Sequence, residues 1–258
     1  MGTAETLIAN QKSGRGSLIG YFPAGYPTVE DSVAALVAMA QNGCDVLEIG
    51  VPYSDPVMDG LVIQQATEAA LANGFRLAQL FEIIAKVREQ TSIPLLVMSY
   101  WNPVISYGLE RFANDLVTSG AQGMITPDLI PDEAADWIEI SERLGLDRVF
   151  LVAPSSSDQR VQQNSAASKG FVYSVSTMGI TGERAELDRL ARAVVSRVQD
   201  AGDTPTCVGV GISTADQVRE VNTYADGAIV GTAFVKAYQT GGLDALVAKT
   251  QELASGLG

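Results

Sequence analysis

Two acidic side chains in the first quarter of the chain are candidates for acid–base chemistry. Glu48 interrupts an apolar strand-like run, Val46–Ile49, and a charged group in a buried strand costs free energy unless it is paired. The run ends at Gly50 and becomes a loop, punctuated by prolines, that carries Asp59. One acid is therefore held on a rigid element and the other on a shaped loop, as a reactive site requires.

Each acid also has a purely structural explanation. Glu48 could bond to backbone donors at the end of its strand, and Asp55 and Asp59 could be ordinary turn formers. For Glu48 we favour the catalytic interpretation, because strand interiors are depleted in Glu and apolar surroundings raise the pKa of a carboxyl group. A carboxyl with a raised pKa exchanges protons near neutral pH.

The composition narrows the chemistry further. The 258 residues include no His, which excludes His-ligated metal sites, Ser-His and Cys-His nucleophile pairs, and imidazole as a general base. Cys44 and Cys207 are isolated and are expected to be buried apolar fillers. The five lysines lie in helical or pre-strand segments, so a Schiff-base aldolase is not expected. We expect no metal, and acid–base catalysis falls to carboxylates.

The overall charge argues against some classes of partner. A net charge of −13 and a pI of about 4.4 disfavour nucleic acid and anionic lipid. No stretch approaches the roughly 18 apolar residues of a membrane span, and the N-terminal residues do not form a secretory signal. We therefore expect a cytoplasmic protein with no membrane partner. A phosphorylated small molecule stays possible, because backbone N–H groups at a helix N-terminus bind phosphate locally.

Eight strand-like runs alternate with helical patterns along the chain, without a linker or a change of composition. They span residues 18–22, 46–49, 94–98, 123–125, 148–152, 171–175, 206–210 and 227–230. Apolar strands joined by crossover helices predict a parallel sheet covered by helices. Eight such units in about 250 residues predict a single (β/α)8 TIM-barrel domain over residues 1–258, with a doubly wound open sheet as the alternative.

In such a barrel the active site lies where strands end and helices begin. Six candidates lie at or near those ends: Glu48, Tyr100, Asp128, Tyr173, Gly211 and Gly231. Residues 100–103 are predicted to form a loop after the third strand.

Glycine-containing turns after the last three strands predict a phosphate site, because glycine lets the backbone approach an anion closely. These turns contain Thr181-Gly182, Gly209–Ser213 with its central Gly211, and Gly231-Thr232. The segment Ser176–Arg184 is predicted to be a lid over the substrate.

Residues 48–56, EIGVPYSDP, followed by Asp59-Gly60 and Ile63-Gln64, resemble the signature of the tryptophan synthase alpha chain family. Segments 179–182, 209–213 and 229–233 resemble its later motifs, in order. Leu61-Val62 depart from the family's usual Pro-Thr. The resemblance implies a (β/α)8 barrel and a lyase of tryptophan biosynthesis, which cleaves indole-3-glycerol phosphate to indole and glyceraldehyde 3-phosphate.

The chemistry of that cleavage agrees with the two acids. It is a retro-aldol step in which indole C3 gains a proton and the neighbouring hydroxyl loses one. We assign the proton shuttle to Glu48 and stabilisation of the positive ring nitrogen to Asp59. Tyr21, Tyr100 and Tyr173 are candidates to line the indole pocket, with packing in the barrel core as the alternative.

The resemblance also implies a partner. The family forms an alpha2-beta2 heterotetramer with a beta chain that uses pyridoxal phosphate, so no cofactor is expected in this chain. Pro52, Asp55, Asn102 and Pro103 fall in segments that the family uses against the beta chain, and they are predicted partner contacts. Two alternatives stay open: a stand-alone lyase, and a non-catalytic subunit that only binds phosphate.

Overall fold

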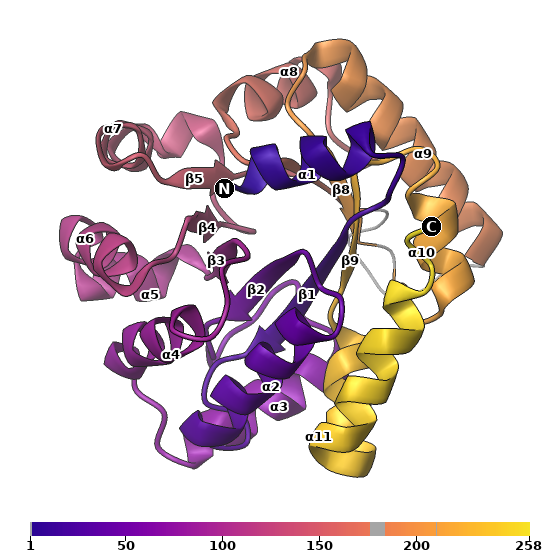
Figure 1. Cartoon of the computed structure of the whole chain (residues 1–258). Coiled ribbons are helices and arrows are strands. Elements are labelled where there is room, and N and C mark those ends of the chain that lie inside the picture. The colour runs from indigo at the N-terminus through magenta and orange to yellow at the C-terminus, as the bar shows by residue number, and fades with distance from the viewer. Residues whose placement is uncertain (1, 176–183, 210) are drawn as a thin grey trace.

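The computed structural model describes residues 2–175, 184–209 and 211–258. Parallel strands form a ring at its centre (Figure 1). The strands are β1 Leu18–Pro23, β2 Val46–Gly50, β3 Leu95–Met98, β4 Gly123–Ile125, β5 Asp147–Val149, β6 Leu151–Val152, β7 Val172–Val175, β8 Thr206–Gly209 and β9 Gly227–Val230.

The ring closes through a strand that is broken in the middle. The neighbour order is β5-β4-β3-β2-β1-β9-β8-β7-β6, and only Phe150 separates β5 from β6. Since β5 pairs with β4 and β6 pairs with β7, residues 147–152 act as a single strand that joins the two edges of the sheet and closes the barrel. The predicted (β/α)8 barrel is confirmed, and the open sheet is not what forms.

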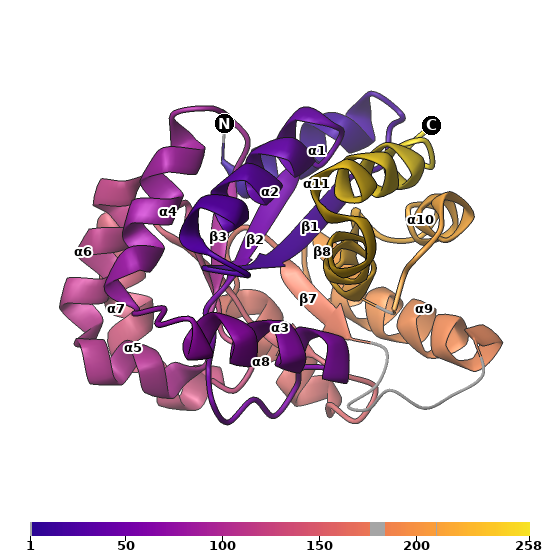
Figure 2. The same cartoon turned by 90° about the horizontal axis from the view of Figure 1, so that it is seen from below.

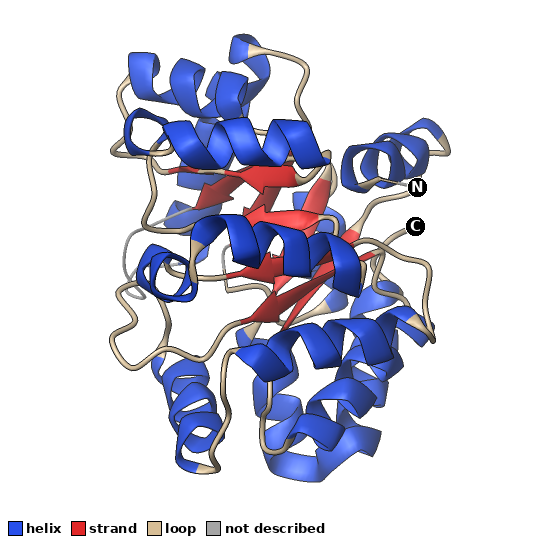
Figure 3. Cartoon of the chain, turned by 90° about the vertical axis from the view of Figure 1, so that its left-hand side faces the viewer, coloured by secondary structure: helices blue, strands red, loops and turns tan. Residues whose placement is uncertain are grey.

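Helices surround the ring (Figure 3). They are α1 Thr3–Lys12, α2 Val29–Gln41, α3 Leu61–Ala72, α4 Ala78–Arg88, α5 Trp101–Tyr107, α6 Leu109–Ser119, the 3₁₀ turn η1 Pro131–Glu133, α7 Ala135–Leu144, α8 Asp158–Ala167, α9 Arg184–Ala201, α10 Ala215–Val221 and α11 Thr232–Ala254. None of the helices in the described part of the chain is both long enough and apolar enough to span a bilayer.

One predicted loop is wrong. Residues 101–107 form α5, so Asn102 and Pro103 stand in the first turn of a helix. Two features allow the helix to begin there. The N–H of Trp101 donates to both carboxylate oxygens of Asp128, at 2.9 and 3.1 Å, and Pro103 lies in the first turn, where its missing N–H is not needed.

Alternate residues of each strand point into the barrel, following the two-residue period of β-structure. One apolar cluster fills the closed end: Leu7, Ile19, Val46, Leu96, Ile125, Val149, Phe171, Cys207 and Ile229. Leu7 comes from α1, which was not predicted. Helix α1 and both termini lie at one end of the barrel, whereas α3 lies at the other (Figure 2).

Candidate active site

Glu48 lies inside the barrel, two residues beyond the apolar cluster at the closed end. It pairs in register with Tyr21 of β1 and Leu96 of β3, and only 1% of its surface is exposed. Its Oε1 atom has no hydrogen-bond partner among the described residues. Burial raises the pKa of Glu48 to about 8, because an ionised carboxylate there would lose its hydration.

Asp59 is positioned by the loop between β2 and α3. The Gln64 side chain of α3 donates to the Asp59 carbonyl at 2.6 Å, and the next residue, Gly60, caps α3. Burial raises the pKa of Asp59 to about 6, while a hydrogen bond from the Tyr100 phenol acts in the opposite direction. Near neutral pH this chain therefore favours a protonated Glu48 and an ionised Asp59.

The charges of both acids act on the same tyrosines, which indicates that the two acids lie near each other. Burial raises the pKa of Tyr21 well above its usual value, and the negative charges of Asp59 and Glu48 raise it further. Burial also raises the pKa of Tyr173, followed by the charges of Glu48, Cys207 and Asp59. The third tyrosine, Tyr100, accepts a hydrogen bond from the Met58 N–H at 2.9 Å. All three phenols stay protonated at neutral pH and can donate hydrogen bonds.

Two glycines make room for these phenols. A Cβ atom on Gly50 would lie 2.2 Å from the Tyr21 hydroxyl oxygen, and one on Gly209 would lie 2.6 Å from the Tyr173 hydroxyl oxygen. Sequence reasoning treated Gly50 as a strand end and Gly209 as part of a phosphate loop. The signal that could have found Gly50 is its spacing, because it follows Glu48 by two residues and therefore faces the same side of β2.

The predicted phosphate residues divide into three groups. Thr232 is the first residue of α11 and Gly231 is its N-cap, so backbone donors of a helix N-terminus lie at the end of β9. Gly211 is exposed and has a φ of +66°, a conformation that favours glycine. Thr181 and Gly182 lie outside the described residues, as does the predicted lid except for Arg184, which begins α9.

The predicted partner contacts differ in accessibility. Asp55 and Asn102 are exposed, Pro103 is partly exposed, and Pro52 is buried within the chain. Large apolar side chains that were not among the predicted partner contacts are exposed close to them in the chain: Val57 is 74% exposed, Leu61 is 70% exposed and Ile105 is 52% exposed.

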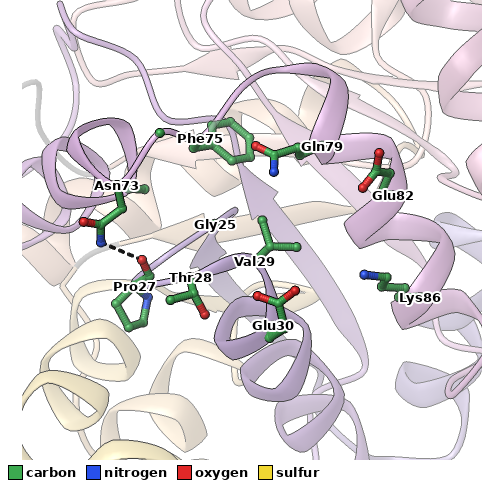
Figure 4. Close-up of a pocket in the computed structure, with 12 residues that line it drawn as sticks. Gly25, Pro27, Thr28, Val29, Glu30, Asn73, Phe75, Gln79, Glu82 and Lys86 are labelled. Atoms are coloured by element: carbon green, nitrogen blue, oxygen red, sulfur yellow. Dashed lines mark hydrogen bonds between the residues drawn. The ribbon is translucent and has the colours of Figure 1, made fainter.

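A separate pocket of about 280 Å³ lies outside the barrel, between the start of α2 and the α3–α4 connection (Figure 4). The Asn73 side chain donates to the Pro27 carbonyl at 2.9 Å along its wall. Neither Glu48 nor Asp59 lines this pocket. It is therefore not part of the candidate active site. Within the described residues, no group of His, Cys, Asp or Glu is arranged to hold a metal ion.

Comparison with known proteins identifies the family. The family model "Tryptophan synthase alpha chain" matches residues 7–256. The tryptophan synthase alpha chain of Leifsonia xyli subsp. xyli is 56% identical over 253 residues, covering 98% of this chain and 97% of that protein. The alpha chain of Mycobacterium avium (strain 104) is 51% identical, covering 94% of this chain and 89% of that one.

A solved structure agrees. A chain in the crystal structure of tryptophan synthase from M. tuberculosis, in an aminoacrylate-bound form, superposes with a TM-score of 0.92 at 44% identity, covering 99% of both chains. This chain therefore belongs to the tryptophan synthase alpha chain family, as its sequence motifs predict.

Proposed function

We propose that the chain cleaves indole-3-glycerol phosphate to indole and glyceraldehyde 3-phosphate, the lyase reaction of its family, with Glu48 and Asp59 as the catalytic residues. Membership of the family supports the reaction. One observation carries the residue assignment: both acids act on the same two buried tyrosines at the open end of the barrel, and their pKa values are raised to different extents.

The first step is proton transfer to the indole ring. Glu48, which is neutral at pH 7, donates its proton to indole C3. The ring nitrogen then carries positive charge, and the ionised carboxylate of Asp59 accepts its N–H and stabilises that charge. The Oε1 atom of Glu48, which has no partner among the described residues, supports this order, because a buried carboxyl without a hydrogen-bond donor favours the neutral form before the substrate reacts.

The second step is bond cleavage. The Glu48 carboxylate now removes the proton of the hydroxyl on the side-chain carbon that is bonded to C3, and this side-chain carbon becomes the aldehyde. The C–C bond breaks, its electron pair returns to the ring, and the ring nitrogen loses its positive charge. Glu48 ends protonated, as it began, so the cycle needs no cofactor in this chain.

The substrate phosphate belongs at the other side of the opening. Backbone N–H groups at the start of α11, at Thr232 and the residue after it, are the donors we assign to it, with Gly231 allowing close approach. Neutral donors suit a chain with a net charge of −13, because its acidic surface does not supply a basic cluster.

We also propose a beta-chain partner, with pyridoxal phosphate bound in that partner, in an alpha2-beta2 assembly. One solved relative, 33% identical with a TM-score of 0.84, comes from a study of mutual activation of the tryptophan synthase a2b2 complex of Pyrococcus furiosus. Asp55 and Asn102 are exposed and Pro103 is partly exposed, and together with the exposed Val57 and Leu61 they support docking of a partner at the open end of the barrel. A single domain over residues 1–258 and a cytoplasmic location stay predictions.

Indole and glyceraldehyde 3-phosphate should be measured for the chain alone and with a beta chain added. We expect both products, faster turnover with the partner, and a loss of about 10²–10³ in kcat/KM for Asp59→Asn, since one charge-stabilising group is removed. Full activity in Asp59→Asn would reduce this residue to a turn former. If the beta chain does not change the turnover and forms no complex with this chain, the chain is a stand-alone lyase.

A further inference from the structure

The loop that carries Asp59 is tied to the start of α5 at two points. Near its end, the Met58 N–H donates to the Tyr100 hydroxyl at 2.9 Å. Near its beginning, the Asn102 side chain donates to the Tyr53 hydroxyl at 3.1 Å, and the rings of Tyr53 and Tyr100 lie 5.5 Å apart. The geometry of this loop therefore depends on where α5 begins.

The start of α5 is itself held by Asp128, which follows β4. Both carboxylate oxygens accept from the Trp101 N–H, so Asp128 fills the role of a helix cap although it is distant in sequence. Just before Tyr100, the Ser99 N–H donates to the Ile125 carbonyl at 3.1 Å. Tyr100 is thus flanked by two residues that are anchored to β4 and its loop.

We propose that Asp128 is a positioning residue for the cleavage reaction, acting on Asp59 through the Trp101 N–H and the Tyr100 phenol. The inference rests on the proposed function, since it requires Asp59 to be catalytic. Asp128 is exposed at the rim, and the role that we assign to it is to hold the start of α5. Loss of this cap would free Tyr100 from Met58, the residue before Asp59, and a small misplacement of a catalytic group can cost about 10² in rate.

The pH dependence distinguishes this role from simple stabilisation. The groups around Asp59 are Tyr100, Tyr21 from β1, Glu48 from β2 and Tyr173 from β7. Among them, Tyr100 is the group that lowers the pKa of Asp59, and its hydroxyl accepts from the N–H of Met58, the residue before Asp59. Loss of the Tyr100 hydroxyl from this position should therefore raise the pKa of Asp59 and move the acid limb of kcat/KM to higher pH.

The experiment compares Asp128→Ala, Tyr100→Phe and the double variant. We expect each single change to lower kcat by up to about 10²-fold and to move the acid limb to higher pH. We expect the double variant to be no worse than the more affected single variant. Asp128→Asn keeps a capping oxygen and should recover most of the activity. The control is Ser157→Ala, which removes the α8 cap that accepts from the Arg160 N–H at 3.2 Å, and it should leave both readouts unchanged.

Effects that multiply in the double variant, or an unmoved acid limb in a folded Asp128→Ala, would overturn the positioning role. If Asp128→Ala does not fold, Asp128→Ser replaces it in the comparison with Tyr100→Phe, because the shorter serine side chain weakens the cap without removing its oxygen. If Asp59→Asn is inactive while Asp128→Ala is normal, only the positioning role fails. If Asp59→Asn is fully active, the proposed function itself fails.

Discussion

The two ends of the barrel interior are built by the same strands and serve different purposes. At the closed end, Ile19 and Val46 pack in a fully apolar cluster. Two residues further along the same strands stand Tyr21 and Glu48. Because strands rise about 3.3 Å per residue, the packed cluster and the proposed catalytic side chain are separated by only about 7 Å along the strand. The alternation of the strand decides that a residue points inward, and the side chain decides whether it stabilises or reacts.

The open end contributes less to the stability of the fold than the closed end does. The closed end buries apolar surface, the main favourable term in folding. The open end buries a carboxyl with an oxygen that lacks a partner among the described residues, which works against stability. Changes at the closed end should therefore lower stability with little effect on kcat, and changes at the open end should lower kcat with little effect on stability. Three experiments test this difference.

The largest effect is expected for Glu48→Gln. The substitution keeps the shape but removes proton transfer, so kcat should fall by about 10²–10⁴ while circular dichroism shows an intact fold. Glu89→Gln, at an exposed position, is the matched control and should retain normal turnover. Near-normal turnover in Glu48→Gln would remove Glu48 from its assigned role.

At the closed end, Ile19→Ala should cost about 2–5 kcal/mol of unfolding free energy, because it leaves a cavity in a packed cluster. Denaturant unfolding measures the loss, and kcat per folded molecule should stay unchanged. A fall in kcat without a loss of stability would show that the two ends are not separable.

A smaller effect is expected from pH, at most about tenfold in rate per pH unit. In the proposed mechanism, the active form has Asp59 ionised and Glu48 protonated. Since the pKa of Asp59 is raised to about 6, kcat/KM should fall as pH drops below that value. Since the pKa of Glu48 is raised to about 8, kcat/KM should also fall as pH rises above it. A flat profile from about pH 5 to 9 would contradict the assignment of both protonation states.

The sequence was sufficient for the barrel, because the strands follow from patterns within short segments. Eight apolar runs predict the eight strands of a barrel. The sequence also singled out Glu48, which the structure buries inside the barrel. Glu48 is unusual because it is the one acidic residue in an aliphatic strand. Helix α5 was missed because its start depends on Asp128, 27 positions further along the chain. The roles of Gly50 and Gly209 were missed for a related reason, since each is explained only by a tyrosine on a neighbouring strand.

The placement of the chain ends has a practical consequence. The two chain ends lie at the end of the barrel that α1 covers (Figure 2). Helix α3, which follows the loop that carries Asp59, lies at the opposite end. A purification tag, a fluorescent label or a tether to a solid support attached at either end would therefore point away from the substrate entrance. Immobilised enzyme should still admit its substrate from the free side, which makes surface-based kinetic measurements feasible.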